Sequence, residues 1–333
     1  MKTLLLLVLL VTFSLVANAK TPIGIVIHGG AGTISRDMMT AEQEQAYHAM
    51  LGHAVNQGYD VLARGGSSLD AVTAAVTILE DSPLFNAGKG AVYTFDEKHE
   101  LDASIMYGLD RSAGAVAGVT NVKNPILLAR AVMEKSVHVM LSGMGAEQFA
   151  QEQKLELVEN SYFDTEFRYE SLKRAKQALV SLPHQANATF DPAWKMGTVG
   201  AVAIDRNGNL AAATSTGGMT AKRYGRIGDA PVIGAGNFAD NHSCAVSATG
   251  HGEFFIRYQV ASDICARAKY QNKSAAKAAQ EVLAELKSVG GDGGVIVVDK
   301  KGELSWAFNT QGMYRAMKTE GGEMHSEIFA AKE

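Results

Sequence analysis

The 333-residue sequence has only two cysteines, Cys244 and Cys265. Two cysteines cannot form the disulfide framework that stabilises small secreted domains. Because neither has further cysteines or clustered histidines beside it, the sequence does not indicate a structural zinc site. A disulfide between the two and a pair of buried free thiols both remain open.

A surplus of basic residues is also missing. The chain has 31 Lys and Arg against 35 Asp and Glu, a formal net charge of −4, and no basic patch of the kind that binds nucleic acid. With 47% hydrophobic and 20% charged residues, the composition is that of a globular protein. The length allows one large domain or two smaller ones with a sizeable core.

Long apolar runs are absent except at the N-terminus, where Leu4 to Val16 follows Lys2 and precedes Ala17-Asn18-Ala19. This pattern predicts a signal peptide over residues 1–19, cleaved after Ala19. The run is too short to span a bilayer, which requires roughly 20 residues. We therefore expect an exported protein without a membrane partner, periplasmic if the source is a Gram-negative bacterium.

Hydrophobic periodicity predicts helices and strands along the rest of the chain. Helices are expected at about 40–65, 67–80, 124–135, 143–153, 168–182, 251–270 and 274–288, and strands at 21–27, 90–94 and 113–119. The first strand is expected to end in a tight turn at His28-Gly29-Gly30-Ala31-Gly32. Residues 181–197 contain two of the six prolines and little periodicity, so we interpret them as an exposed linker.

Two hairpins are predicted in the C-terminal half. Residues 198–204 and 210–216 flank a turn with Asn207-Gly208 at its tip, and 293–298 and 304–308 repeat the pattern. Centring the first turn at Asn207 places Thr198 opposite Thr216. Centring it between Asn207 and Gly208 shifts the pairing by one residue. Helices combined with antiparallel strands favour an α+β layered fold over a doubly wound sheet.

Thr198 has the sequence context of a hidden nucleophile. It follows the small residue Gly197 and opens an apolar run well inside the chain. A threonine hydroxyl needs an adjacent base, and a threonine at a new N-terminus provides one as its own α-amine. An α-amino pKa of about 7.7–8.0 suits that role near neutrality. The Gly197-Thr198 bond is therefore a candidate for self-cleavage.

Three downstream segments offer the other groups that amide hydrolysis requires. Ser215-Thr216-Gly217-Gly218 supplies hydroxyls. Arg226-Ile227-Gly228-Asp229 supplies a cation and a carboxylate for the α-groups of an amino acid, although this spacing is more often a surface ion pair. Thr249-Gly250-His251-Gly252-Glu253 is predicted to open a helix whose N–H groups stabilise an oxyanion, or simply to be a glycine-rich helix start.

Together these segments resemble the plant-type asparaginase and isoaspartyl peptidase family of N-terminal nucleophile hydrolases, over nearly all of the mature chain. Further segments that carry the resemblance are His28 to Gly32, Leu84 to Gly90 and Glu100 to Met106. The resemblance implies a four-layer αββα sandwich built from two subunits, residues 20–197 and 198–333. It also implies a heterotetramer, (αβ)₂, of two processed chains.

The resemblance also implies roles for individual residues. Thr198 resembles the nucleophile, Thr216 its helper, and Thr249 with the Gly250 N–H the oxyanion hole. Asn86 resembles a residue near the nucleophile, with a structural turn as the alternative. Substrate contacts are implied for Arg226, Ile227, Gly228, Asp229, Thr249, Gly250, His251 and Gly252. No catalytic cofactor is implied; a structural sodium ion is, on main-chain carbonyls of Leu79, Glu80, Ser82, Phe85, Ala87 and Lys89.

The expected activity is hydrolysis of β-aspartyl dipeptides and of the side-chain amide of L-asparagine. The alternative is a glycosylasparaginase of the same superfamily, which differs in the pocket for the leaving group. The Gly197-Thr198 junction and the scarcity of cysteine favour the first. A third hypothesis, a non-enzymatic exported binding protein, would leave the chain uncleaved.

Overall fold

The computed structural model describes residues 21–181 and 197–331, so the expected signal peptide and nearly all of the expected linker lie outside the described residues. Two sheets form the centre: an eight-stranded sheet in the order β12-β11-β1-β5-β6-β2-β3-β4, and a four-stranded sheet in the order β10-β9-β8-β7. The strands are β1 (Gly24–Gly32), β2 (Leu101–Tyr107), β3 (Ala113–Val119), β4 (Met140–Ser142), β5 (Val199–Ile204), β6 (Leu210–Thr216), β7 (Asn237–Ala239), β8 (Cys244–Gly250), β9 (Gly293–Asp299), β10 (Leu304–Phe308), β11 (Gly312–Thr319) and β12 (His325–Phe329).

The α-helices are α1 (Ala41–Ala63), α2 (Ser68–Glu80), α3 (Pro125–Lys135), α4 (Gly143–Glu152), α5 (Glu166–Ser181), α6 (Gly252–Tyr258), α7 (Val260–Tyr270) and α8 (Ala275–Ser288). Hydroxyl side chains cap the N-termini of several of these helices. Thr40 forms a capping box with Gln43 before α1, and Ser67 and Ser274 accept N–H bonds at the starts of α2 and α8. Among the described residues, no helix is both long and apolar enough to cross a membrane.

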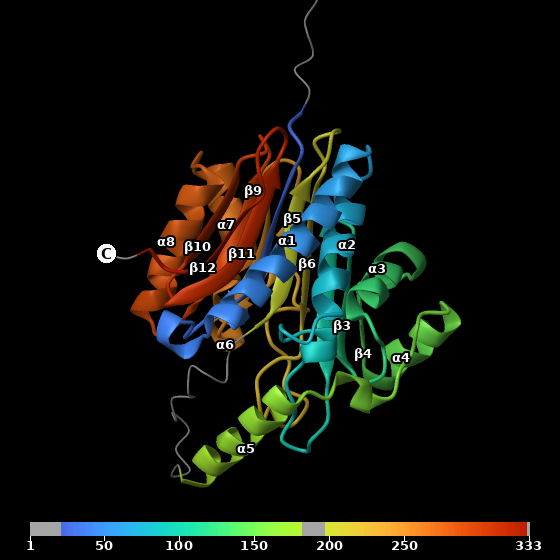
Figure 1. Cartoon of the computed structure of the whole chain (residues 1–333). Helices are drawn as coiled ribbons and strands as arrows, with labels where there is room; N and C mark the ends of the chain where they lie inside the picture. The colour runs from blue at the N-terminus through green and yellow to red at the C-terminus, as the bar shows by residue number, and fades with distance from the viewer. Residues whose placement is uncertain (1–20, 182–196, 332–333) are drawn as a thin grey trace, which may run out of the picture.

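Alternation along the strands produces three of the four apolar clusters among the described residues. Odd-numbered β1 residues such as Ile25 and Ile27 pack on the side of α1 and α2, whereas Val26 faces the second sheet. On the second sheet, Ile296 faces the first sheet, and Val297 packs with α7 and α8. Figure 1 shows α1 and α2 across the larger sheet and α7 and α8 beside the smaller one. The predicted α+β class is confirmed.

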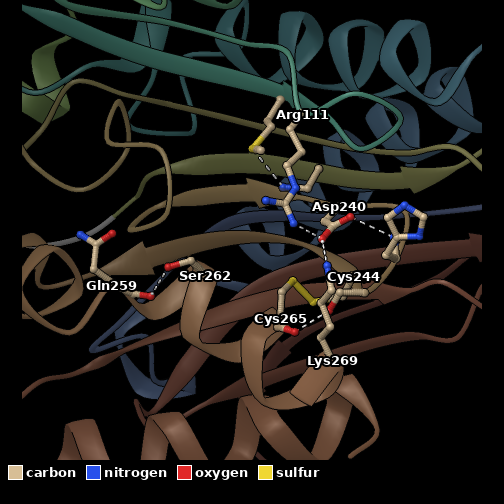
Figure 2. Close-up of a disulfide and its surroundings, with 11 residues drawn as sticks. Arg111, Asp240, Cys244, Gln259, Ser262, Cys265 and Lys269 are labelled. Carbon is tan, nitrogen blue, oxygen red and sulfur yellow. Dashed lines mark hydrogen bonds and ion pairs between the residues drawn. A yellow bond between two sulfur atoms is a disulfide. The ribbon is translucent and has the colours of Figure 1, made fainter. Parts of the chain in front are cut away.

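A disulfide joins Cys244, the first residue of β8, to Cys265 on α7. The sequence left this pairing open. Figure 2 shows the bridge beside Asp240, whose carboxylate accepts hydrogen bonds from Arg111 at 2.5 Å and Lys269 at 3.0 Å. Burial would raise the pKa of Asp240, but hydrogen bonds from His242, Arg111 and Lys269 lower it to about 2. The start of β8 is thus held by a covalent bond and two ion pairs.

Several sequence predictions of secondary structure were wrong. The predicted strand 90–94 is absent, because Gly88–Gly90 forms a short 3-10 turn and the Val92 N–H bonds the Asn86 side chain. The predicted helix 251–270 is two helices, broken at Gln259, whose backbone is left-handed with φ +50°. The predicted turn at His28 to Gly32 is the end of β1, with a register shift between His28 and Gly30.

Candidate active site

Thr198 immediately precedes β5, and its hydroxyl lies next to that of Thr216 at the end of β6. The strands pair with Val199 opposite Ser215, which continues to Thr198 opposite Thr216. The two Oγ1 atoms are 3.1 Å apart, and Thr216 also accepts the Gly218 N–H at 3.0 Å. The predicted hairpin is confirmed in the register centred at Asn207, so local turn geometry brings the two hydroxyls together.

Gly197 and Asn86 meet on the other side of Thr198. The Asn86 N–H donates to the Gly197 carbonyl at 3.0 Å, and the Asn86 side chain donates to the Gly218 carbonyl at 2.7 Å. Gly197 has φ +117°, and a Cβ atom placed on it would lie 2.6 Å from Cβ of Asn86. A glycine is therefore required at this junction. Asn86 connects its own loop to Gly218 through its side chain and also lies beside the bond that precedes Thr198.

His28 on β1 fixes the backbone of Thr198. Its Nδ1 bonds the Thr198 carbonyl at 3.0 Å, and its Nε2 bonds the Ser247 hydroxyl of β8 at 2.9 Å. Burial lowers the pKa of His28 to about 3, although the hydrogen bond to the Thr198 carbonyl acts in the opposite direction. The ring is therefore neutral, with Nδ1–H as the donor, and it links both sheets to Thr198. Sequence reasoning placed His28 only in a glycine motif and missed this role.

Asp229 is the buried carboxylate of the expected substrate clamp. It is 5% exposed, and its Oδ2 atom has no hydrogen-bond partner among the described residues. Burial raises its pKa to about 7, because the carboxylate has lost water and gained too few donors in return. A buried carboxylate oxygen without a hydrogen bond destabilises the folded protein unless a ligand donates a hydrogen bond to it.

Arg226 is held by Glu253, to which the sequence analysis gave no role. Its Nε and Nη2 donate to the two carboxylate oxygens of Glu253, both at 2.9 Å, and His251 lies 3.2 Å from the same carboxylate. Burial would raise the pKa of Glu253, but bonds from His251 and Arg226 lower it. The only signal for Glu253 in the sequence was its place in the Thr249-to-Glu253 segment, within the first turn of the expected 251–270 helix. The pair orients the guanidinium and leaves Nη1 outside the bidentate contact.

Gly252 and Gly228 flank that guanidinium. A Cβ atom on Gly252 would lie 2.9 Å from Nη2 of Arg226 and 3.0 Å from Oδ1 of Asp229, and one on Gly228 would lie 2.9 Å from Nη1. The two glycines therefore make room for the charged pair rather than contacting it through side chains. Ile227 is 42% exposed and does not line the pocket beside Thr198.

Thr249 and Gly250 end β8 instead of opening a helix, which corrects the sequence prediction. The strand continues because both residues pair with β9, and α6 begins only after His251. The Thr249 hydroxyl is buried and accepts the Ala31 N–H at 3.4 Å. Gly250, the last residue of β8, lines the pocket beside Thr198.

One small pocket collects most of the expected groups. It is lined by Thr198, Thr216, Gly218, Met219, Arg226, Gly228, Asp229 and Gly250. Of the expected substrate contacts, Ile227, Thr249, His251 and Gly252 do not line it. Its volume is about 10 Å³, room for roughly one water molecule.

The six residues expected to bind sodium lie at the end of α2, which includes Leu79 and Glu80, and in the loop that follows it. A Cβ atom on Gly90 would lie 2.1 Å from the Phe85 carbonyl oxygen and 2.7 Å from that of Pro83, so main-chain oxygens converge there. The Glu80 side chain is buried and accepts bonds from Ser215 at 2.6 Å and from the Ile126 N–H at 3.0 Å. Among the described residues, no group of three His, Cys, Asp or Glu side chains is arranged to hold a metal ion.

Comparison with known proteins gives a consistent result. The model of the asparaginase family matches residues 20–328. An isoaspartyl peptidase of Escherichia coli K12 is 51% identical over 92% of this chain and 96% of its own length. One of Salmonella typhimurium is 53% identical, covering 92% and 98%, and a human isoaspartyl peptidase/L-asparaginase is 45% identical, covering 85% and 88%. The chain belongs to the asparaginase family.

Proposed function

We propose that this protein is a self-processing threonine hydrolase that cleaves β-aspartyl dipeptides and the side-chain amide of L-asparagine, releasing L-aspartate. One observation carries the proposal. The Thr198 hydroxyl, 3.1 Å from that of Thr216, shares a pocket with Asp229, whose buried oxygen has no partner among the described residues. The names of the relatives from Escherichia coli and from human support the same activity.

Maturation begins at the bond before Thr198. Its Oγ attacks the Gly197 carbonyl carbon, the C–N bond breaks and an ester forms. Water then hydrolyses the ester to a Gly197 carboxylate and a Thr198 that carries a free amine. The Asn86 N–H, 3.0 Å from the Gly197 oxygen, is placed to stabilise the charge that develops there. The products are the chains 20–197, after signal removal, and 198–333.

In the processed enzyme the free amine of Thr198 takes the proton from Oγ, and Oγ attacks the side-chain carbonyl of the substrate. The Gly250 N–H and the Thr249 hydroxyl would hold the oxyanion, a contribution typically worth about 2.7–4 kcal/mol per donor. The amine of the substrate then leaves, taking the proton that the α-amine of Thr198 accepted from Oγ. Water then attacks the β-aspartyl ester and releases L-aspartate.

The substrate's α-groups match the charges at the far end of the pocket. The α-ammonium would satisfy Oδ2 of Asp229 and lower its pKa from about 7, and Arg226 would receive the α-carboxylate. Because Glu253 already holds two guanidinium nitrogens, the substrate carboxylate has to approach from the Nη1 side or displace Glu253. Glu253 therefore positions the clamp.

The proposal includes the architecture that accompanies this chemistry. The three apolar clusters support a four-layer αββα sandwich of the N-terminal nucleophile type. We further propose export to the periplasm, directed by residues 1–19, and assembly of two processed chains as (αβ)₂. The converging carbonyls around Gly90 suit a hard, weakly charged cation such as sodium, which has a structural role in this proposal.

The deciding experiment is intact-mass analysis with N-terminal sequencing of each fragment, beside assays with L-asparagine and a β-aspartyl dipeptide. Chains beginning at Lys20 and Thr198, both activities, and their loss together with processing in Thr198→Ala are expected. An uncleaved but active Thr198→Ala protein would refute the mechanism. Faster turnover of a sugar-linked asparagine would favour the glycosylasparaginase alternative, and an uncleaved, inactive wild-type protein would favour the binding-protein hypothesis.

A further inference from the structure

A row of polar residues interrupts the apolar layer between the two sheets, close to Thr198. In the larger sheet His28 of β1 is paired with Gly200 of β5, Gly200 with Thr214 of β6, and Thr214 with Ser104 of β2. Paired residues point to the same face of a sheet, so this row faces the smaller sheet. Two positions away along each strand, the corresponding row is apolar and consists of Val26, Val202, Ala212 and Met106.

Two polar residues of the smaller sheet meet this row. Ser247 of β8 and Asn237 of β7 are paired with each other. A Cβ atom on Gly200 would lie 2.5 Å from Nε2 of His28 and closer still to Oγ of Ser247, so the glycine leaves space for their contact. We call the five polar residues the polar layer, and each of them is 0% exposed: His28, Ser104, Thr214, Asn237 and Ser247.

The donors and acceptors at one end of the polar layer have a fixed order. Nδ1 of His28 faces the Thr198 carbonyl at 3.0 Å, so Nδ1 carries the proton of the neutral ring. Nε2 then accepts the Ser247 hydroxyl at 2.9 Å. Because the Ser247 proton is engaged, Oγ1 of Thr214 donates to the Ser247 oxygen, 2.7 Å away. Three hydrogen bonds in one direction therefore end at the Thr198 carbonyl.

The other end of the polar layer reaches the main chain beside Asp229. The Asn237 side-chain amide donates to Oγ1 of Thr214 at 3.4 Å and to the Ser104 carbonyl at 3.2 Å. The Ser104 hydroxyl donates at 2.5 Å to the carbonyl of Ala230, the residue that follows Asp229. The same layer thus contacts the main chain of the nucleophile and that of the substrate clamp.

The polar layer is not completely satisfied. Oδ1 of Asn237 has no hydrogen-bond partner among the described residues. The Gly236 carbonyl lies 3.1 Å from Oγ1 of Thr214, and it keeps the Ala248 N–H as a donor, at 2.9 Å, when the Thr214 proton points to Ser247. A partly satisfied buried network stabilises a fold less than apolar side chains of similar size. A role in geometry explains polar residues at these positions better than stability does.

We propose that the polar layer positions the nucleophile and the substrate clamp relative to each other, an inference that rests on the proposed function. Ser247 and Thr214 act on the nucleophile through His28, and Ser104 acts on the clamp through the Ala230 carbonyl. All three hydroxyl residues are positioning residues, and none of them lines the pocket of the nucleophile.

The two ends of the polar layer can be tested separately, because self-cleavage requires the nucleophile but no bound amino acid. Ser247→Ala leaves Nε2 of His28 without its donor. We expect self-cleavage and the kcat per cleaved chain for L-asparagine to fall about tenfold, with KM within about twofold of wild type. Ser104→Ala should instead raise KM about fivefold and leave the rate of self-cleavage at the wild-type value. Time courses of intact mass and steady-state kinetics measure both effects.

Thr214→Val covers the case in which Ser247→Ala does not fold, because valine keeps the branched shape of threonine and lacks only the hydroxyl. This variant should slow self-cleavage and lower kcat/KM, and Thr214→Ser, which retains the hydroxyl, should restore both. Thr73→Val is the matched control at a buried threonine of α2 whose hydroxyl donates to the Leu69 carbonyl. It should lower the free energy of unfolding without changing self-cleavage or hydrolysis.

Wild-type rates of self-cleavage and hydrolysis in folded Ser247→Ala or Thr214→Val protein would overturn the assignment while leaving the proposed function intact. Equal slowing of self-cleavage by Ser247→Ala and Ser104→Ala would also overturn it, since the two ends would then not act on different groups. A wild-type protein that neither cleaves itself nor hydrolyses L-asparagine would instead overturn the proposed function, and this inference with it.

Discussion

Gly197 and His28 constrain the backbone on the two sides of Thr198. Asn86 holds the Gly197 carbonyl by its N–H, and His28 holds the Thr198 carbonyl by Nδ1. Each contact depends on a property that substitution removes: the absence of a side chain at Gly197, and a buried neutral ring at His28. Both residues can therefore be tested singly, with controls elsewhere in the chain.

Replacing Gly197 with alanine should slow self-cleavage by an order of magnitude or more. The added Cβ would lie 2.6 Å from Asn86, and φ +117° is unfavourable for alanine, so the carbonyl has to leave its N–H donor. A time course of intact mass measures the effect. Gly208→Ala is the control. Gly208 also has a positive φ, +78°, but a Cβ atom added there would lie no closer than 3.9 Å to any neighbouring side chain or backbone atom. Processing of Gly197→Ala at the wild-type rate would contradict the role of this contact.

Acid should destabilise the protein through His28. Its pKa is about 3 in the folded state and about 6.5 when unfolded, so between these values the unfolded chain binds a proton that the folded chain does not. The contribution of His28 to stability is complete above pH 6.5 and is lost as the pH falls toward 3.

Urea unfolding at pH 6.5 and pH 5 measures this loss, which should be about 2 kcal/mol larger in the wild-type protein than in His28→Asn. The variant removes the titrating ring and retains a side-chain donor. His53→Asn changes an exposed histidine of α1 and should follow the wild-type protein. Equal pH dependence in wild type and His28→Asn would show that the ring is not held neutral.

At the scale of elements, β8 connects the covalent bridge to the catalytic end. It starts at Cys244, bonded to α7, and ends at Thr249 and Gly250. Its neighbour β9 starts at Gly293, which pairs with Gly250, so one end of this two-strand unit borders the pocket of Thr198. The disulfide lies at the opposite end and is buried, which separates its effect on stability from any effect on chemistry.

Removing the disulfide should lower the free energy of unfolding by about 3 kcal/mol, the loop-closure contribution expected for a bridge of this span. The two cysteines are 21 residues apart. Urea unfolding of the double variant Cys244→Ala/Cys265→Ala, compared with the wild-type protein, gives the value. Its kcat for L-asparagine should remain within about twofold of wild type at a temperature where both are folded. A large loss of kcat with an unchanged free energy of unfolding would contradict a role of the disulfide in stability alone.

At the scale of the whole molecule, the proposed cleavage site divides the large sheet between two interleaved chains. Strands β1 to β4 precede residue 197, and β5, β6, β11 and β12 follow it. In the sheet, β1 lies between β11 and β5, and β2 is paired with β6. Each chain would therefore complete the other's hydrogen-bonded ladder and share its core.

The two processed chains should consequently stay together without a covalent link. Denaturing electrophoresis should separate them, while size-exclusion chromatography should show one species of the same size as the uncleaved Thr198→Ala protein. The physical reason is that separation would expose both ladders of β1 and the apolar cluster shared with α1 and α2. Elution of free 198–333 chains under native conditions would contradict this arrangement.

The sequence by itself determined what depends on neighbouring residues. The Asn207-Gly208 turn predicted the hairpin, and one of its two possible registers brings Thr198 to Thr216. The helices expected at 40–65, 67–80 and 274–288 begin at the hydroxyl caps Thr40, Ser67 and Ser274 of the structure. It also indicated the Arg226–Asp229 segment, both members of which line the pocket. Turns and caps are predictable because their hydrogen bonds close within a few residues.

Only the tertiary structure decided which distant groups meet. It placed β1 between β5 and β11, paired Glu253 with Arg226 and joined His28 to Thr198. It also extended β8 through Gly250, since pairing with β9 outweighs the local preference for a helix start. Such contacts join residues that lie 27 positions apart for Arg226 and Glu253 and 170 positions apart for His28 and Thr198, and no local pattern encodes them.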